Sequence, residues 1–534
     1  MNDVGESRNL KLRLLSMLVL GLALCWSQVA LSELPNEGLV CSPDDPVMDD
    51  TETLRAWSLQ LRGYPPTVNE YDAIETGDTS SEELLAQWLT SPEFAEQGVR
   101  FHRNHFWPNV TNINLFSAAF SLRREGGTLQ YWRRTNATLN YRGDFVPCLD
   151  EPAQYDEYGQ LVAEEQPDGT HREGYVLINP YWAPDTTIKV CGYDAQSNTH
   201  GITGVFCGSR SATNDKSCGC GPDLRYCRYG NSQRPITQAL GDDLDRRVRA
   251  VIEEDEAYTE LFASQRAFVN GPLSFYLRHQ TGVFAGIRFD PPAISIDSIP
   301  ELDYTAEDTW YQLSLDSAHA GVLTSPAYLI RFQTNRARAN RFFDSFLCQP
   351  FQAPDSGLPL GEETIPHPDL QQRDGCKYCH ALLEPAAAHW GRWTEGGTGY
   401  LDPEVYPRLR DECSACATYG VNCSEDCNRF YLTNPLTALE AEYLGELRSY
   451  VFRRPDHEIN VEAGPELLVS KAVGDGRLPL CVAKRTSEWL LGRTLEPREN
   501  GWLTDLAGEF VANGLRFKDL VHAIVTSETY RRVR

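Results

Sequence analysis

The feature that most constrains the fold of this chain is its content of cysteine. The 534 residues include 16 cysteines. In an oxidising compartment such a chain is held together by disulfides, whereas in the cytosol the same side chains are kept reduced and more often bind metals or take part in catalysis. The compartment therefore decides how the cysteines are interpreted, and the N-terminus gives the first indication of it.

Residues 1–32 have the three parts of a signal peptide. A basic region from Arg8 to Arg13 precedes the apolar segment Leu14–Trp26, and small residues at Ala30 and Ser32 suit cleavage before the next residue. An uncleaved membrane anchor is the alternative, because the apolar segment could be extended. We expect cleavage and therefore an exported protein, with no membrane span after the signal is removed.

The chain is strongly acidic, with a formal net charge of −26 and a pI of about 4.9. Nucleic acids are bound through Lys and Arg side chains that neutralise phosphates, so this charge argues against a nucleic-acid partner. Hydrophobic residues make up 41% of the chain, which is enough for large cores. At about 150 residues for each domain, the length predicts two to four units.

The pattern along the chain predicts a mainly α, multi-module helical protein with a cysteine-rich, loop-rich insert that contains short β-strands. Two β-prone runs in that insert are Tyr175–Ile178 and Thr187–Val190. The expected units are an N-terminal helical module (33–142), the insert (143–235), a central helical module (236–348), a cysteine-rich segment with the C-x-x-C-H motif (349–433) and a C-terminal helical module (434–534).

Helical periodicity is clearest in the C-terminal module. Asn434 as a cap and Pro435 as a first helical residue predict a helix whose apolar face runs from Leu436 to Val451. Three further helices are expected near 464–473, 479–492 and 502–513. A last helix is expected to turn Phe517, Leu520, Val521, Ile524 and Val525 to one side.

The motif Cys376-Lys377-Tyr378-Cys379-His380 carries the most specific chemistry in the sequence. C-x-x-C-H is the signature of c-type haem attachment: two thiols reach the two haem vinyl groups, and the adjacent histidine ligates the iron. We therefore expect a covalent haem c on Cys376 and Cys379, with His380 as the proximal iron ligand. The motif is followed by ALLEP and AAAHW, which we expect to supply apolar surface for the ring.

Three other interpretations of the motif stay open. The two cysteines could form a disulfide in an oxidising compartment. They could form half of a zinc site with Cys413 and Cys416, which have the same spacing. They could form a redox pair, although no thioredoxin-like βαβ pattern surrounds them.

The sixth iron ligand is harder to assign. Met48 is the one methionine outside the signal, so a His/Met site is disfavoured. His102 and His105 lie three residues apart on one helical face, and either is a speculative distal ligand. His319 and His389 are other candidates, and for each histidine a structural role is the alternative.

The remaining cysteines point to a disulfide scaffold. If the signal takes Cys25 and the haem takes two, an odd number remains, so at least one thiol is free or pairs between chains. Cys348 and Cys481 lie in apolar helical patterns and are expected to be buried or bonded to each other. The group Cys413, Cys416, Cys423 and Cys427 could bind zinc or a cluster, but disulfides are favoured in an exported chain.

Several stretches resemble the planctomycete-cytochrome-like proteins, a family of exported bacterial proteins built from domains of unknown function. The similarity is carried by AYTELFASQRAFVNGPLSFYL (257–277), by residues 319–351, by CKYCHALLEPAAAHWGRW (376–393) and by residues 480–532, and more loosely by LRGYPPTVNEYDAI (61–74). The resemblance implies a mainly α-helical fold with the haem motif between helical modules, and a periplasmic or cell-surface location in a bacterium. It carries over Cys376, Cys379 and His380 as haem-site residues. Glu384 stands where the family usually has Asp, and the 143–235 insert has no counterpart.

These observations favour an exported c-type haem protein that passes electrons to a redox partner protein whose identity is unknown. One alternative is a non-haem, disulfide-stabilised secreted binding or surface protein. The other is a haem enzyme of the peroxidase type, in which His102 or Arg103 would lie on the distal side of the haem.

Overall fold

The structure is a computed structural model, and it describes residues 47–124, 129–133, 142, 146–351, 366–421 and 423–532. Within these ranges it contains 17 α-helices, while the strands are short and form four small sheets. The expectation of a mainly α protein is therefore confirmed. The expected signal peptide lies outside the described residues, so the structure does not test it.

Four helices form the N-terminal part of the described chain: α2 (Asp50–Arg62), α3 (Val68–Thr76), α4 (Ser81–Leu89) and α5 (Pro92–Phe106). The first three begin at capping boxes, for example that of Asp49 and Glu52, in which each side chain accepts a hydrogen bond from the other residue's backbone N–H. The fourth has Pro92 in its first turn, where the missing N–H costs no hydrogen bond. Local sequence therefore specifies where these helices start.

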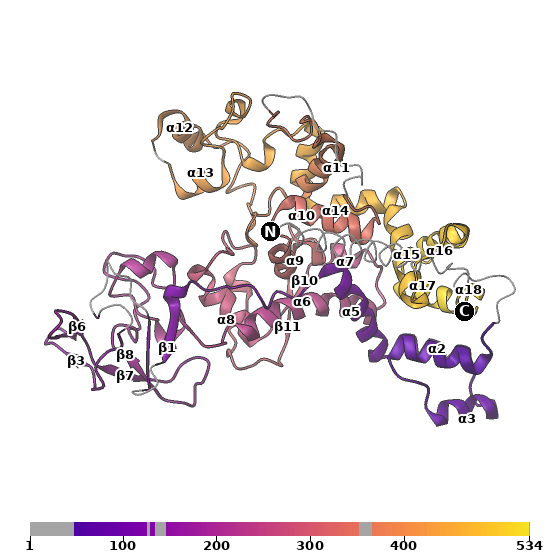
Figure 1. Cartoon of the computed structure of the whole chain (residues 1–534), viewed down its shortest axis with the longest axis horizontal. Helices are drawn as coiled ribbons and strands as arrows, with labels where there is room; N and C mark the ends of the chain where they lie inside the picture. The colour runs from indigo at the N-terminus through magenta and orange to yellow at the C-terminus, as the bar shows by residue number, and fades with distance from the viewer. Residues whose placement is uncertain are drawn as a thin grey trace, which may run out of the picture.

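The N-terminal helices pack against the C-terminal ones, as the indigo and yellow ends in Figure 1 show. The indole Nε1 of Trp57 on α2 donates a hydrogen bond to the carbonyl oxygen of Val525 at 2.9 Å. The C-terminal helices are α14 (Pro455–Gly474), α15 (Arg477–Leu491), α16 (Asn500–Ala512), α17 (Phe517–Val525) and α18 (Glu528–Arg531). Most apolar residues of both sets belong to one core, so the two ends of the chain form one helical body.

The helix expected from Pro435 to Val451 was wrong. The segment contains only the short 3-10 helices η9 (Glu440–Tyr443) and η10 (Arg448–Tyr450), and Leu436 is 84% exposed. Its backbone pairs with distant loops, since the N–H of Leu447 donates to the carbonyl oxygen of Arg408 at 2.8 Å. Gly445, with φ of 82°, also interrupts any helical run.

The insert shares a five-stranded mixed sheet, in the order β7-β8-β2-β1-β9, with two strands that precede residue 143 in a stretch expected to be helical. The strands of this sheet are β1 (Ser121–Arg124), β2 (Gln130–Arg133), β7 (Tyr175–Ile178), β8 (Ile188–Cys191) and β9 (Arg228–Tyr229). The β-prone run at 175–178 thus forms β7, and the run at 187–190 overlaps β8; the two strands pair antiparallel. Two small hairpins join β3 (Gln154–Tyr155) to β4 (Leu161–Val162) and β5 (Glu164–Glu165) to β6 (His171–Arg172).

Three disulfides and a buried ionic cluster hold the insert together. The disulfides are Cys148–Cys191, Cys207–Cys218 and Cys220–Cys227. Beside them the guanidinium of Arg142, which is fully buried, lies 2.7 Å from a carboxylate oxygen of Asp194 and 3.6 Å from one of Glu173. Such cross-links add to the hydrophobic core in which Val190, Ala212 and Leu224 of the insert pack.

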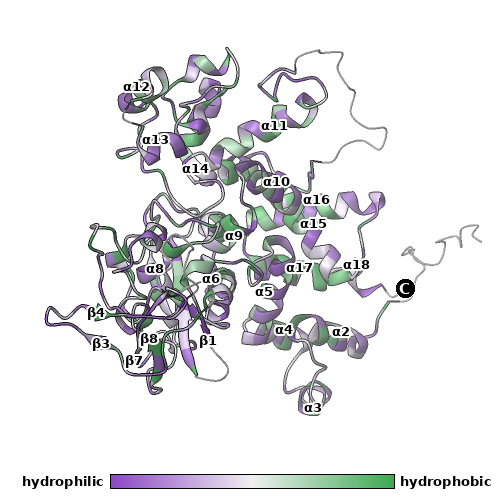
Figure 2. Cartoon of the chain, turned by 60° about the vertical axis from the view of Figure 1, so that its left-hand side comes forward, coloured by the Kyte–Doolittle hydropathy of each residue, from purple (hydrophilic) through white to green (hydrophobic). Residues whose placement is uncertain are grey.

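The central part joins the insert to the helical body. Its elements are α6 (Arg234–Glu253), α7 (Glu260–Ala263), β10 (Arg266–Val269), α8 (Gly271–His279), β11 (Tyr311–Ser314), α9 (Pro326–Arg331) and α10 (Asn335–Phe346). Helix α6 contributes to both large cores: Leu244 packs in the core of the helical body, and Leu240 packs in a second core that the insert shares with the central part. Figure 2 shows apolar and polar residues alternating along these helices, as expected for helices with one buried face.

The remaining elements are α11 (Lys377–Ala387), α12 (Asp411–Tyr419) and α13 (Glu425–Phe430). Helix α11 packs against α10 and α14, whereas α12 and α13 lie at the edge of the molecule, at the upper left in Figure 1. A disulfide between Cys348 and Cys481 links the end of α10 to α15 and confirms the expected pairing of these two residues. No helix in the described ranges is long and apolar enough to cross a membrane.

Candidate functional site

The C-x-x-C-H motif forms the first turn of α11. Cys376 is the residue before the helix, and the N–H of His380 donates to its carbonyl oxygen at 3.0 Å. Cys376 and Cys379 are therefore one turn apart on one face of the helix. Both are partly exposed and both are free thiols.

These two thiols are exceptional among the described cysteines. The other twelve are all paired in six disulfides. Of the cysteines that follow the expected signal, this leaves Cys41, which lies outside the described residues. The fold thus closes its disulfide scaffold without using the C-x-x-C pair.

His380 is held by a carboxylate one turn further along the same helix. Its Nδ1 lies 2.7 Å from Oε1 of Glu384 and donates its proton there, which places the lone pair on Nε2. Nε2 has no hydrogen-bond partner among the described residues. This is the arrangement of a metal-ligating histidine, in which the second ring nitrogen donates to a carboxylate that fixes the tautomer and orientation of the ring.

Glu384 is itself fixed by two arginines, one on α10 and one in the loop before α14. Nε of Arg336 on α10 donates to Oε1 at 2.5 Å, and Nη1 of Arg453 donates to the carbonyl oxygen of Glu384 at 2.6 Å. Burial alone would raise the pKa of Glu384, but the hydrogen bonds from Arg336 and His380 and the two guanidinium charges hold it below its ordinary value. The carboxylate is therefore ionised at neutral pH.

The surface around the motif is only partly apolar. Tyr378 and Leu382 are 57% and 63% exposed on α11 and could contact a flat apolar group. The expected AAAHW surface does not face a haem at the motif, because Ala386, Ala387 and Trp390 are buried against the helical body. The motif's own residues fit a covalently attached haem: two free thiols on one helical face, and an imidazole whose Nε2 is unpartnered within the described chain.

His102, one of the two speculative distal ligands, has both ring nitrogens occupied. Nδ1 lies 2.7 Å from the carbonyl oxygen of Gly98, so it donates there, and Nε2 accepts from the hydroxyl of Tyr258 at 2.9 Å. The side chain is 1% exposed, and burial lowers its pKa to about 3. These contacts give His102 a structural role in the core.

His105 and His389 also contact the protein interior. Nδ1 of His105 lies 3.0 Å from the carbonyl oxygen of Phe101, and burial lowers its pKa to about 4. His389 is buried and its Nδ1 donates to the carbonyl oxygen of Gly464 on α14. None of the described hydrogen bonds or ring contacts of His102, His105 or His389 joins them to His380.

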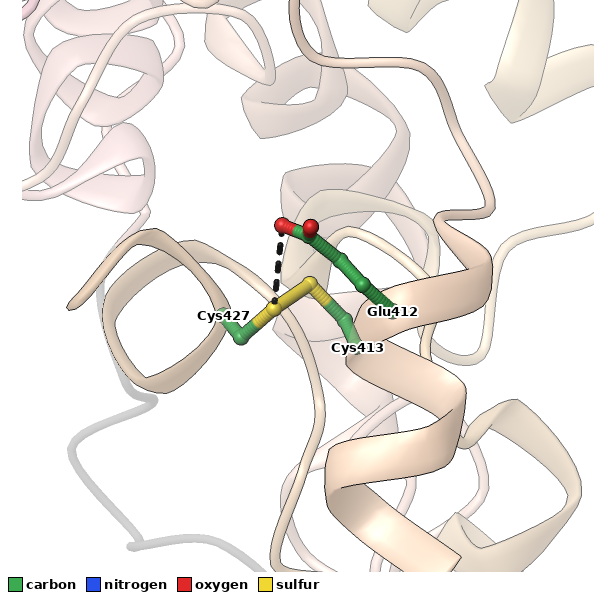
Figure 3. A group of neighbouring side chains, drawn as sticks. All are labelled: Glu412, Cys413 and Cys427. Carbon is green, nitrogen blue, oxygen red and sulfur yellow. Dashed lines mark hydrogen bonds between the residues drawn. A yellow bond between two sulfur atoms is a disulfide. The ribbon is translucent and has the colours of Figure 1, made fainter. Parts of the chain in front are cut away.

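The cysteines of α12 and α13 form disulfides, Cys413–Cys427 and Cys416–Cys423. Glu412 lies beside the first of them, with Oε1 3.7 Å from Sγ of Cys427 (Figure 3). Glu412, Cys413 and Cys427 bring ligand-type atoms within 4.8 Å of one another, but a disulfide offers no thiolate to a metal. This geometry favours the expected disulfides over a zinc site shared with the C-x-x-C pair.

The contact between Glu384 and His380 was not predicted from the sequence. The spacing of four residues within a helix is visible in the sequence and would have suggested the contact. The partner Arg453 follows Glu384 by 69 residues and could not be found in this way.

A comparison of the chain with models of protein families, with curated proteins and with solved structures found no match.

Proposed function

We propose that the chain is an exported c-type haem protein that transfers electrons in a periplasmic or cell-surface redox system. The observation that carries this proposal is the combination at the start of α11. Cys376 and Cys379 stay reduced while every other described cysteine is paired, and the adjacent His380 has its Nδ1 held by a buried carboxylate. The resemblance of residues 257–277, 319–351, 376–393 and 480–532 to planctomycete-cytochrome-like proteins supports the same conclusion.

Each residue of the site has a distinct part in this proposal. Cys376 and Cys379 would hold the haem through thioether bonds to carbons of its two vinyl groups, and Nε2 of His380 would be the iron ligand. The bound haem supplies a centre that accepts and gives up one electron. Glu384 keeps Nδ1 of His380 protonated and hydrogen-bonded, so that the ring presents a fixed, more basic Nε2.

Electron transfer is favoured over a peroxidase reaction by the state of His102. A distal acid–base group needs an unpartnered ring nitrogen on the open side of the haem, whereas both nitrogens of His102 are hydrogen-bonded within the core.

A secreted binding or surface protein without haem is the second candidate. The six disulfides favour it, because a disulfide scaffold suits an extracellular protein whether or not Cys376 and Cys379 bind haem. The two candidates differ in one respect: the first requires a haem that survives unfolding of the protein.

The test is intact-mass spectrometry under denaturing conditions on full-length chain exported from a bacterium that attaches haem to c-type cytochromes. The proposal predicts one haem mass on the wild type and none on the Cys376→Ala/Cys379→Ala variant. The matched control, Cys416→Ala/Cys423→Ala, removes one of the described disulfides and leaves Cys376 and Cys379 in place, so it should keep the haem. A wild type that is folded and exported without the added mass supports the second candidate.

A further inference from the structure

A cavity of about 220 Å³ lies in the central part of the chain, and none of its lining residues belongs to α11. Its walls are mainly apolar, with Leu277, Phe289, Ile299 and Trp393 among them. A dry cavity of about 150 Å³ accommodates one benzene molecule. This cavity therefore has room for a single six-membered ring with small substituents.

His319 gives the cavity a hydrogen-bond acceptor. The side chain is 4% exposed, and its Nδ1 lies 3.0 Å from Oδ1 of Asp316, to which it donates a proton. Burial lowers the pKa of His319, so the ring is neutral at neutral pH and Nε2 carries a lone pair. Nε2 has no hydrogen-bond partner in the described chain, but it is not among the fully buried atoms. Since His319 lines the cavity, Nε2 faces into it.

Thr398 adds a second polar group. Thr398 is 4% exposed and lines the cavity. Its hydroxyl has no hydrogen-bond partner among the residues that the structure describes, and it too is not among the fully buried atoms. Buried polar groups are normally paired. Two such groups in one apolar cavity therefore indicate a ligand that combines an apolar body with hydrogen-bonding substituents.

The charged residues of the cavity are already paired. The guanidinium of Arg247 donates to the carboxylate of Asp243, with Nη2 2.9 Å from Oδ2, and to the carbonyl oxygen of Gly321 at 3.1 Å. Asp290 forms an ion pair with Arg429 of α13. The cavity thus offers neither an anion nor a cation an uncompensated partner, and a neutral ligand suits it best.

We propose that this cavity binds a small neutral phenol, with the ring between the apolar walls and the hydroxyl donating to Nε2 of His319. A phenol fits each observation: one ring fits the volume, the aromatic walls at Phe289 and Trp393 favour an aromatic ligand, and a neutral hydroxyl donates to a neutral imidazole. The hydroxyl of Thr398 can bond the phenol oxygen or a further substituent. The proposal does not depend on the haem.

The test is isothermal titration of the full-length exported chain with phenol, toluene and anisole. Toluene replaces the hydroxyl by a methyl group, and anisole keeps the oxygen but cannot donate. Phenol is expected to bind at least tenfold more tightly than either, since the unpartnered Nε2 gains nothing from them. Equal binding of phenol and toluene, or no binding of phenol, overturns the proposal.

Two variants locate the binding. His319→Phe is expected to abolish the preference for phenol over toluene, while His171→Phe in the exposed hairpin β5/β6 should keep it. Ala293→Trp adds a bulky side chain at the cavity wall and should abolish binding of all three compounds; it serves as the decisive variant if His319→Phe does not fold. Phenol binding that survives Ala293→Trp overturns the assignment of the site.

Discussion

His380 and Glu384 lie one turn apart on α11, with Nδ1 of the imidazole 2.7 Å from Oε1 of the carboxylate. Glu384 is only 5% exposed and is ionised because Arg336 and Arg453 compensate its charge. A buried carboxylate of this kind is costly unless it is paired. Its position suggests that it orients and polarises the histidine.

Replacement of Glu384 tests this relationship. In the haem-loaded protein a carboxylate on Nδ1 makes His380 a stronger donor and stabilises the oxidised iron, so Glu384→Gln should raise the reduction potential. Each tenfold change in relative stabilisation corresponds to about 59 mV. Glu384→Asp keeps the charge and should restore most of the wild-type potential in a redox titration. Equal potentials in wild type and Glu384→Gln would contradict the role assigned to the carboxylate.

The disulfide Cys348–Cys481 should contribute more to the free energy of unfolding than the side chains of Cys376 and Cys379 do in the haem-free protein. It closes a loop with a sequence separation of 133, and loss of such a cross-link typically costs about 2–5 kcal/mol. Cys348→Ala/Cys481→Ala should lower the free energy of unfolding by that amount in a denaturant titration. The haem-free variant Cys376→Ala/Cys379→Ala is the control and should unfold like haem-free wild type. A comparable loss in both variants would speak against this account.

The hydrogen bonds of His102 should stabilise the fold, and His102 should not ligate the haem iron. Tyr258→Phe removes the hydroxyl that donates to Nε2 and leaves a buried acceptor unpaired, at a cost of about 1–3 kcal/mol. We expect a lower melting temperature with an unchanged visible spectrum of the haem-loaded protein. A change in the position or spin state of the haem bands in Tyr258→Phe would restore His102 as a candidate ligand.

The buried side chain of Glu173 should make the stability of the insert depend on pH. Burial raises the pKa of Glu173 to about 7 despite the nearby Arg142. The folded state therefore retains a proton that the unfolded state loses above its ordinary pKa of 4.5, and this site's contribution to stability decreases as the pH rises from about 4.5 to 7. Glu173→Gln, which cannot ionise, should gain in melting temperature relative to wild type between pH 5 and pH 8. A difference between the two proteins that is the same at both pH values would contradict the raised pKa.

Local sequence was sufficient to predict some elements of the fold. Helix α17 follows from the apolar spacing of Phe517, Leu520 and Ile524, all of which are buried. Strand β7 was recognised because Tyr175–Ile178 is a compact β-prone run. In both cases the sequence preference and the tertiary packing agree.

The predictions that were wrong concern residues whose structure is decided by contacts with distant parts of the chain. Residues 436–451 have helical spacing, yet Leu447 pairs its backbone with Arg408, and this pairing with a distant loop replaces a helical turn. At the site, the motif itself was evident from three residues, whereas the burial of AAAHW depends on packing against α14 and could not be read from a run of small residues. The spacing of His102 and His105 suggested a ligand pair, but the hydroxyl of Tyr258, 156 residues away, occupies the first of them.

The most direct test of the central claim is a pyridine haemochrome spectrum of the full-length chain, exported from a bacterium with haem-attachment machinery. The account predicts the α-band of a c-type haem in the wild type and its loss in Cys376→Ala/Cys379→Ala. Folded, exported wild type without haem absorbance would contradict the account, and the reduced thiols of α11 would then require another explanation.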